Sequence, residues 1–344
     1  MSKNKKKWPK IIALTLLVVV ILGGVAGWLI YDYASVGYSG EKCRLFVDAS
    51  NGEKALCDSL KKTLGEEYGG RVYEVWSKIA EPERLKSGSY VIEPGEEAWR
   101  FARRIKNRQQ DPINITFNNL RNVEQLAARL DEQLLVDSLA LYTAIDSILR
   151  EQGVDKANYV AHFFPNTYEV YWTESAENIV TRITGHYTQF WNEERLAKAK
   201  KLNLSPEEVS TLASIVEEET NKRDERPKVA RLYLNRLNIG MKLQADPTVK
   251  YAVGDFTLRR ILNKHLEVNS PYNTYKHQGL PPGPIRMPES ATLDAVLNAP
   301  QHKYIYMCAK EDFSGYHNFA VDFATHQANA RKYQAALNRR GIRK

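Results

Sequence analysis

Hydrophobic positions are spaced in three ways along the chain, and each spacing predicts a different region. Residues 11–30 are apolar apart from Thr15, and twenty such residues can cross a hydrocarbon core of about 30 Å as a helix. Between residues 41 and 118, short apolar runs alternate with polar turns, which predicts small strands and helices. Several longer runs between residues 119 and 344 repeat with a period near 3.6. The pattern predicts an α+β fold with one transmembrane helix, a small α/β subdomain and a larger mixed α+β domain.

The expected elements of the small subdomain follow from local alternation and turn residues. They are strands over Cys43–Val47 and Arg71–Trp76, a helix over Gly52–Tyr68, a turn from Leu85 into a strand ending at Ile92, a helix carrying Ala98, Phe101, Ala102 and Ile105, and a closing strand over Ile113–Phe117. A subdomain of this kind either binds a polymer or acts as a spacer.

The larger domain is expected to begin with helices and to end with a small sheet. The expected elements are helices over Asn122–Leu130, Asp137–Arg150 and Ala176–Ala199, strands over Tyr304–Ala309 and after Gly315, and a helix over Thr325–Leu337. The aromatic segment between residues 162 and 172 is either core packing or a surface on which sugars stack.

The most informative helix starts after Ser205. Ser205-Pro206-Glu207-Glu208 combines an N-cap serine, a proline at the first helical position and a capping-box glutamate. The helix then has an apolar stripe made of Val209, Leu212, Ala213, Ile215 and Val216.

Three glutamates end this helix in different directions. At about 100° per residue, Glu219 lies within the apolar stripe, Glu218 points away from it and Glu217 is at its margin. A carboxyl group on a buried face is costly to ionise, so its pKa rises toward values useful for a general acid. The alternative is an ion pair between Glu219 and Arg223 or Arg226, which spacing alone does not exclude.

Polar side chains suited to a binding site follow this helix. A second helix from Pro227 to Gly240 brings Asn235 and Arg236 back toward the first one. Asp246 supplies a second carboxylate beside Gln244, although an Asp before Pro often only turns the chain.

Two further loops have a distinctive composition. The segment 269–275, with Tyr272, Asn273 and Tyr275, mixes aromatic and amide groups, which suits a carbohydrate and also an ordinary ordered loop. The segment 279–285 is rich in Gly and Pro, which favours a rigid wall with close backbone approach.

The distribution of basic residues around the apolar run predicts that most of the chain lies outside the cytoplasm. Lys3, Lys5, Lys6, Lys7 and Lys10 precede the apolar run, which favours a cytoplasmic N-terminus of residues 1–10. The apolar run exceeds the usual length of a signal-peptide core, so an anchor is favoured over a cleaved leader. Aromatic residues suited to the two membrane interfaces flank the run: Trp8, Trp28, Tyr31 and Tyr33.

Charge and cysteine content argue against several other classes. The net charge of +8 falls nearly to balance once the basic tail is set aside, so a nucleic-acid partner is not expected. Cys43, Cys57 and Cys308 lack metal-ligand spacing, and Cys43 and Cys57 are either a disulfide or separately buried. No cofactor or metal motif appears.

Several of these motifs together resemble the endolytic murein transglycosylase (YceG-like) family. The segments that carry the resemblance are Leu212–Thr220, Asn235–Leu237, Gly240–Thr248, Tyr272–Tyr275 and Gly279–Ile285, with weaker matches at His317–Phe319 and Thr325–His326. Residues 41–118 are similar in order and size to the family's LysM-like subdomain, and 119–344 to its catalytic domain. The chain departs from the family at Asn166 and at Asn118-Asn119, where family members usually carry an acidic residue and a Glu-Gly pair.

The resemblance implies a lytic transglycosylase, a carbon–oxygen lyase that cleaves the β-1,4 bond between MurNAc and GlcNAc within peptidoglycan strands. It implies 1,6-anhydro ends, termination of strand elongation, and Glu219 as the catalytic residue. The residues that we expect around the sugar are Asn235, Gln244, Asp246, Tyr272, Asn273 and Tyr275, with Arg226 or Arg236 orienting groups or contacting stem-peptide carboxylates.

The expected partners and location follow from this class. They are peptidoglycan strands, the inner (cell) membrane as a single-pass anchor, and peptidoglycan synthases or elongation and division proteins, with the catalytic domain extracytoplasmic. A muramidase-type hydrolase and a non-catalytic wall-binding or division scaffold remain alternatives. Analysis of the products would separate them.

Overall fold

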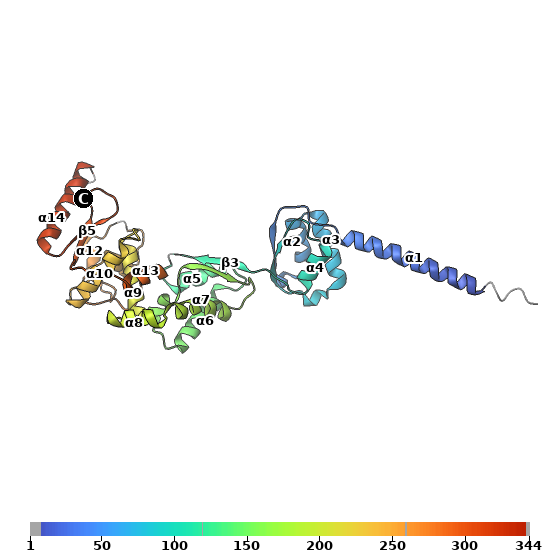
Figure 1. Ribbon diagram of the computed structural model, residues 1–344, viewed down its shortest axis with the longest axis horizontal. Helices are drawn as coiled ribbons and strands as arrows, with labels where there is room; N and C mark the ends of the chain where they lie inside the picture. Colours follow the sequence, from blue (N-terminus) through green and yellow to red (C-terminus); the bar gives the residue numbers. More distant parts are fainter. Residues whose placement is uncertain (1–7, 119, 259, 342–344) are drawn as a thin grey trace, which may run out of the picture. The chain divides into compact units, whose positions relative to one another are not determined.

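The computed structural model describes residues 8–118, 120–258 and 260–341, and within them the chain forms two compact units (Figure 1). The first unit comprises the chain up to Asn114 together with Glu169–Glu174, and the second comprises Ile115–Tyr168 and Ser175 onward. Lys3, Lys5, Lys6, Lys7 and Asn119 lie outside the described residues.

The first unit begins with helix α1 (Trp8–Ala34). Its stretch Lys10–Ala34 is long and apolar enough to cross a membrane, and its large apolar side chains are exposed. The helix predicted over residues 11–30 is therefore confirmed as a helix.

A βααβ arrangement with one further helix forms the rest of this unit. Strands β1 (Cys43–Val47) and β2 (Gly88–Ile92) pair antiparallel, with Cys43 opposite Ile92 and Val47 opposite Gly88. Helices α2 (Gly52–Leu64), α3 (Glu66–Ile79) and α4 (Ala98–Lys106) pack around a core that includes Trp76 and Phe101. Two short 3₁₀ helices, η1 (Ala49–Asn51) and η2 (Pro82–Arg84), precede α2 and β2.

The strand predicted over Arg71–Trp76 is wrong, because these residues belong to α3. Tyr68, Val72 and Trp76 are spaced by four residues and are all buried, which is the period of a helix and not of a strand. The preceding helix is also shorter than predicted, because Gly65 adopts φ +89° between α2 and α3.

The second unit starts with small elements and a helical layer. Strands β3 (Ile113–Phe117) and β4 (Asn166–Val170), of which residues 115–117 and 166–168 belong to this unit, form a two-stranded sheet. The other elements of this part are α5 (Val123–Asp131), α6 (Ser138–Glu151), η3 (Lys156–His162), α7 (Ala176–Phe190) and α8 (Glu193–Lys201). The single helix predicted over Ala176–Ala199 is divided into α7 and α8, because the Asn192 side chain caps α8 by accepting from the Arg195 amide.

Helix α9 (Pro206–Glu219) lies at the centre of the C-terminal part and packs against α8, α10, α11 and α13. The elements that follow it are α10 (Arg226–Asn238), α11 (Asp246–Val253), α12 (Asn263–Leu266), α13 (Ser290–Leu297), β5 (Tyr306–Ala309), β6 (His317–Ala320) and α14 (Phe323–Arg339). Strands β5 and β6 pair antiparallel, with Ala309 opposite His317. The predicted α+β class is confirmed as a mostly helical fold with small sheets.

Candidate active site

The start of α9 has the predicted capping box. The Ser205 hydroxyl accepts a hydrogen bond from the Glu208 amide at 3.2 Å, and the Glu208 carboxylate accepts one from the Ser205 amide at 2.8 Å. This cap fixes the first turn of the helix and so the direction in which each residue of its last turn points.

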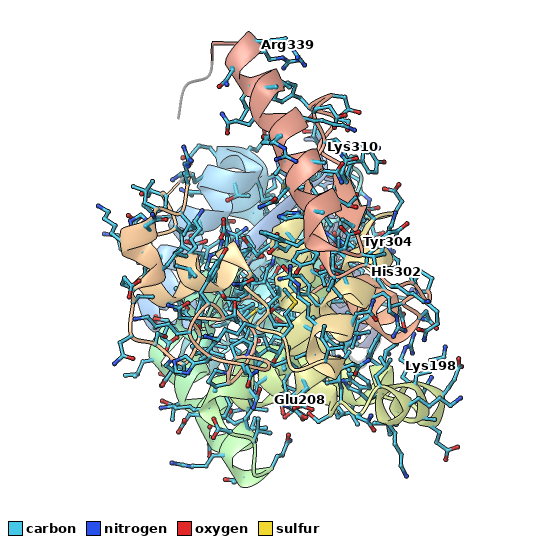
Figure 2. All side chains as sticks on the ribbon, turned by 90° about the vertical axis from the view of Figure 1, so that its left-hand side faces the viewer. Lys198, Glu208, His302, Tyr304, Lys310 and Arg339 are labelled. Atoms are coloured by element: carbon cyan, nitrogen blue, oxygen red, sulfur yellow. The ribbon has the colours of Figure 1, made fainter. Side chains whose placement is uncertain are left out.

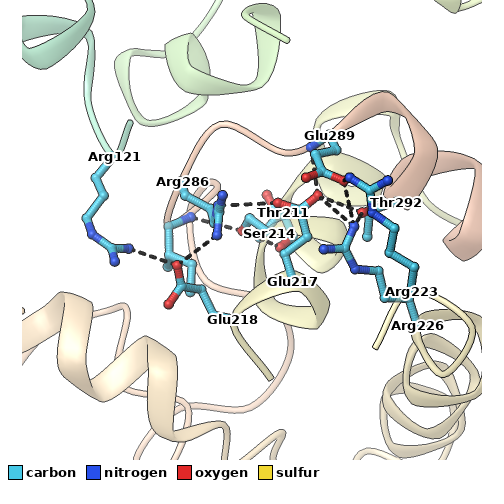
Figure 3. A network of polar contacts seen from close by, with 11 residues as sticks. Arg121, Thr211, Ser214, Glu217, Glu218, Arg223, Arg226, Arg286, Glu289 and Thr292 are labelled. Carbon is cyan, nitrogen blue, oxygen red and sulfur yellow. Dashed lines mark hydrogen bonds and ion pairs between the residues drawn. The ribbon is translucent and has the colours of Figure 1, made fainter. Parts of the chain in front are cut away.

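Glu217 points into a buried polar network (Figure 3). Its Oε1 accepts hydrogen bonds from the Thr292 hydroxyl at 2.6 Å and the Glu289 amide at 2.7 Å. Its Oε2 lies 3.2 Å from Nε of Arg286, and Arg226 lies 3.7 Å from Oε1. Burial raises the pKa of Glu217, and these partners oppose the rise.

The predicted position of Glu217 at the margin of the buried stripe is wrong, because its side chain is fully buried. The helical wheel assumed one buried face, whereas α9 is enclosed by neighbouring elements on most sides. Even the small polar residues of α9, Ser210, Thr211 and Ser214, are inaccessible.

Glu218 leaves the helix in another direction and forms two ion pairs. Arg121 and Arg286 each place an Nη1 atom 3.1 Å from its Oε1 (Figure 3). The two arginines that were alternative partners for Glu219 are engaged with Glu289 instead: Arg226 at 2.8 Å and Arg223 at 3.4 Å. No ion pair of Glu219 with either arginine occurs among the described residues.

Glu219 lines an open cleft, which Glu217 and Glu218 do not line. The cleft has a volume of about 240 Å³ and is lined by Glu219, Leu232, Tyr233, Arg236, Gln244, Asp246, Tyr275, Met307, Cys308, Ala309 and His317. Oε1 of Glu219 accepts a hydrogen bond from the buried Tyr233 hydroxyl at 2.7 Å. Its Oε2 has no hydrogen-bond partner within the described part of the chain and is not buried.

The environment of Glu219 favours its protonated form. Loss of hydration raises the pKa of Glu219 to about 7, and the negative charge of Asp246 adds to the rise. The Tyr233 hydrogen bond opposes it, as do His317 when its ring is protonated and the Arg236 guanidinium. A carboxyl group with a pKa near neutrality can both donate and accept a proton at physiological pH.

Asp246 and Tyr275 form a second polar pair in this cleft. The Tyr275 hydroxyl donates to Oδ1 of Asp246 at 2.6 Å, and burial together with this carboxylate raises the pKa of Tyr275. Asp246 is the first residue of α11, where a negative charge is favoured by the helix dipole. Gln244, with φ +49°, lines the cleft close to this pair in sequence.

Three other predicted substrate contacts do not line this cleft. Asn235 donates to the carbonyl oxygens of His302 and Tyr304 at 2.7 and 3.0 Å, and these two acceptor residues are labelled in Figure 2. Asn273 is fully buried and donates to the carbonyls of Leu266 and Val268. Tyr272 packs against the Tyr251 ring, with 4.7 Å between centroids.

These contacts define what the three residues do in the fold. The two amides bond to backbone carbonyls of other segments, and the Tyr272 ring packs against another ring. Their assignment to substrate stays a prediction.

The two predicted arginines have different positions. Arg226 belongs to the buried network, where it also donates to the Thr292 hydroxyl at 2.7 Å. Arg236 lines the cleft, but its guanidinium group is largely buried and donates to the backbone carbonyls of Ile305 and Leu243. Arg236 therefore contributes positive charge near Glu219 from a fixed position.

The Gly- and Pro-rich segment 279–285 supports α9. The Ile285 amide donates to the Ser214 hydroxyl at 3.0 Å. A Cβ atom on Gly283 would collide with the Ala157 carbonyl oxygen, so only glycine permits this approach. The segment is not among the residues that line the cleft.

Two residues that line the cleft, Tyr233 and His317, were not among the predicted site residues. Tyr233 lies on the predicted helix from Pro227 to Gly240, where nothing in the local sequence indicates a role for its hydroxyl. Its spacing of fourteen residues from Glu219 becomes informative only when the angle between α9 and α10 is known. His317 was noted only as part of a weak family match near the end of the chain.

The fold and the cleft together define a mixed α+β protein in which a glutamate with a raised pKa lines an open cleft. The model of the YceG-like family matches residues 47–332, and the chain belongs to this family. A crystal structure of a YceG-like protein from Listeria monocytogenes has the same fold, with a TM-score of 0.57 and 24% identity over 84% of this chain and 98% of that one.

Two curated relatives are named endolytic murein transglycosylase. The protein from Bacillus subtilis is 31% identical over 218 residues, which is 62% of this chain and 59% of the relative. The protein from Streptococcus pneumoniae serotype 2 is 28% identical over 189 residues, covering 54% of this chain and 34% of the relative. The matched regions thus span little more than half of the first relative and a third of the second.

Proposed function

We propose that this protein is a membrane-anchored lytic transglycosylase that cleaves the MurNAc–GlcNAc bond within peptidoglycan strands. The observation that carries the proposal is Glu219: its Oε2 faces the cleft, its Oε1 is held by Tyr233, and its pKa is raised to about 7. Membership of the YceG-like family and the names of the relatives support the substrate class.

The proposed reaction uses Glu219 twice. Protonated Glu219 donates its proton to the glycosidic oxygen while the bond from C1 to that oxygen breaks, and the GlcNAc unit leaves with a free 4-hydroxyl. The Glu219 carboxylate then removes the proton from the muramyl 6-hydroxyl, whose oxygen bonds to C1. The products are a 1,6-anhydro end and a reprotonated Glu219, so no water is consumed.

A pKa near 7 suits this double role. An ordinary glutamate with a pKa of 4.5 would be mostly ionised at neutral pH and would be a poor proton donor. The fixed hydrogen bond from Tyr233 orients the carboxyl group and stabilises the carboxylate formed between the two steps.

A hydrolase remains the second candidate, because Asp246 lines the same cleft. Retaining and inverting glycosidases use a second carboxylate about 5–9.5 Å from the acid. In this protein Asp246 accepts a hydrogen bond from Tyr275, which suits a loop-organising or substrate-contacting role.

The deciding experiment is product analysis on purified, uncross-linked glycan strands in water enriched in oxygen-18. We expect the wild type to produce anhydro ends without oxygen-18, and Glu219→Gln to produce none while keeping its fold. Glu177→Gln, a change at an exposed glutamate on α7, is the matched control and should retain full activity. Oxygen-18 in the new ends would identify a hydrolase, and full activity of Glu219→Gln would exclude the proposal.

We further propose that α1 anchors the protein in the cell membrane with residues 1–10 in the cytoplasm. Its length and apolar composition support the anchor, and the basic residues before it support the orientation. In spheroplasts, externally added protease should then remove the folded units and leave the first residues protected. Protection of the folded units would reverse the orientation.

A further inference from the structure

His317 and Glu225 form a polar pair beside the cleft that the proposed reaction does not use. Nδ1 of His317 lies 2.7 Å from Oε2 of Glu225, and the His317 amide donates to Oε1 of the same carboxylate at 2.9 Å. The Glu225 side chain is 5% exposed and that of His317 is 15% exposed. One carboxylate therefore binds the backbone and the ring of a single histidine.

A hydrogen bond also links the His317–Glu225 pair to the end of helix α9, which carries Glu219. The hydroxyl of Thr220, the next residue after Glu219, donates to Oε2 of Glu225 at 3.2 Å. The Thr220 hydroxyl also accepts the Lys222 amide at 3.0 Å, which fixes the turn between α9 and α10. His317, although 98 residues away in the chain, is thus fixed relative to Glu219.

The contact with Glu225 determines which ring nitrogen remains for other partners. Because a carboxylate accepts hydrogen bonds, Nδ1 is the nitrogen that carries the hydrogen. Nε2 then has an acceptor lone pair in the neutral ring. Nε2 has no hydrogen bond to any residue in the described part of the chain, it is not buried, and His317 lines the cleft.

We propose that His317 contacts the glycan substrate through Nε2, accepting a hydrogen bond from a sugar hydroxyl or acetamido N–H, and that Glu225 is its positioning residue. The inference rests on the proposed function of the cleft and names a binding contact within it. In other active sites, a carboxylate that accepts a hydrogen bond from one ring nitrogen fixes the tautomer and the orientation of the histidine. Glu225 would do the same for His317.

The other groups facing this part of the cleft agree with a substrate contact. Besides His317, the charged or titratable residues that line it are Glu219 from α9, Arg236 and Tyr233 from α10, Asp246 from α11, Cys308 from β5, and Tyr275. Arg236, Tyr233 and Tyr275 donate hydrogen bonds to other groups of the protein, and Asp246 accepts one through Oδ1. His317 Nε2, like Glu219 Oε2 and Asp246 Oδ2, has no hydrogen bond to another residue in the described part of the chain and is available to a ligand.

Two substitutions separate binding from folding. His317→Asn places an amide N–H where Nδ1–H was, so the bond to Glu225 is kept and the Nε2 acceptor is lost. Glu225→Gln keeps an acceptor for the His317 amide but turns an N–H toward Nδ1, which forces the hydrogen onto Nε2. His277→Asn, at an exposed histidine outside the cleft, is the matched control.

We expect His317→Asn and Glu225→Gln each to lower kcat/KM on glycan strands by about tenfold, the size of one lost hydrogen bond, with urea midpoints close to the wild type. Binding of inactive Glu219→Gln to the same strands should weaken by a similar factor when His317→Asn is added. His317→Gln, whose longer amide reaches the Nε2 position, should recover part of the affinity.

The outcomes are distinct. Unchanged kcat/KM and unchanged strand binding of His317→Asn would overturn the inference. A wild type that makes no anhydro ends, yet binds strands in a way that depends on His317, would end the proposed lytic reaction and leave the contact standing. Loss of activity together with a large fall in the urea midpoint of His317→Asn would assign the pair to folding alone and would also overturn the inference.

Discussion

Tyr233 donates its phenolic hydrogen to Oε1 of Glu219 across 2.7 Å, and so connects the consecutive helices α9 and α10 at the candidate catalytic carboxyl. The donor ring is almost fully buried, whereas the acceptor reaches the cleft. This hydrogen bond stabilises the ionised form of Glu219 and so opposes the effect of burial on its pKa.

Removing this hydrogen bond should therefore make Glu219 a weaker acid. In Tyr233→Phe we expect the pKa of Glu219 to rise above about 7 and the alkaline limb of the kcat profile to move to higher pH. The rate should fall by about 10–100-fold, because the carboxylate is less well oriented for the second proton transfer. A pH profile between 5 and 9 tests this, and an alkaline limb that moves to lower pH would contradict it.

The negative charge on Asp246 has the opposite effect on the pKa of Glu219 from the Tyr233 hydrogen bond. It raises the pKa of Glu219, so Asp246→Asn should lower this pKa and move the alkaline limb to lower pH. The amide oxygen can still accept the Tyr275 hydroxyl, so the fold should be kept. A transglycosylase should retain measurable activity in this variant. Complete loss, equal to that of Glu219→Gln, would favour the hydrolase in which Asp246 is the second catalytic carboxylate.

The raised pKa of Glu219 also costs stability above a defined pH. The folded state binds the proton more tightly than the unfolded state, whose pKa is near 4.5, so the penalty is absent below pH 4.5 and complete above about 7. The shift from 4.5 to about 7 corresponds to at most about 3 kcal/mol. Partial exposure to the cleft reduces this value.

Glu219→Gln should accordingly be more stable than the wild type at pH 8, by about 1–3 kcal/mol, and close to it at pH 4.5. Urea unfolding at both pH values measures the difference, with Glu177→Gln as the control that removes an exposed carboxyl. A stability difference that shrinks as the pH rises would be inconsistent with a raised pKa.

The buried Glu217 should matter for folding more than for chemistry. Glu217→Ala leaves Arg226 and Arg286 beside an emptied position and removes the acceptor of Thr292, so we expect a loss of about 3–5 kcal/mol. Glu218→Ala, at a partly exposed site, should cost less. Urea unfolding compares the two, and equal losses would show that burial does not distinguish these neighbours.

Regular elements with clear periodicity could be predicted from the sequence. The strands over 43–47 and 113–117 and the helices after Ser205 and Pro227 are confirmed, because their capping and turn residues act locally. The strand over 71–76 failed since Val72 and Trp76 satisfy both a two-residue and a four-residue period. The local pattern therefore allows both a strand and a helix, and packing against neighbouring elements determines that the segment is helical.

The site was harder to predict than the helices that carry it. Sequence reasoning selected Glu219, Gln244, Asp246 and Tyr275, all of which line one cleft. We also predicted Asn235, Tyr272 and Asn273 as substrate contacts, and this stays a prediction, because these three do not line the cleft and an amide that bonds to the backbone cannot be told from one that faces a ligand in a sequence. Contacts between distant segments, such as His317 with Glu225, depend on tertiary structure and had no local indication.

The three consecutive glutamates have a consequence for how this protein tolerates insertions and deletions. Each residue turns an α-helix by about 100°, so removing one residue between Ser205 and Glu217 would rotate the end of α9 by that amount against its neighbours. The residue presented to the cleft would no longer be the one beside Tyr233, although the composition of the helix would barely change. The count of residues between the cap and Glu219 is therefore under stricter constraint than the identity of most residues on α9.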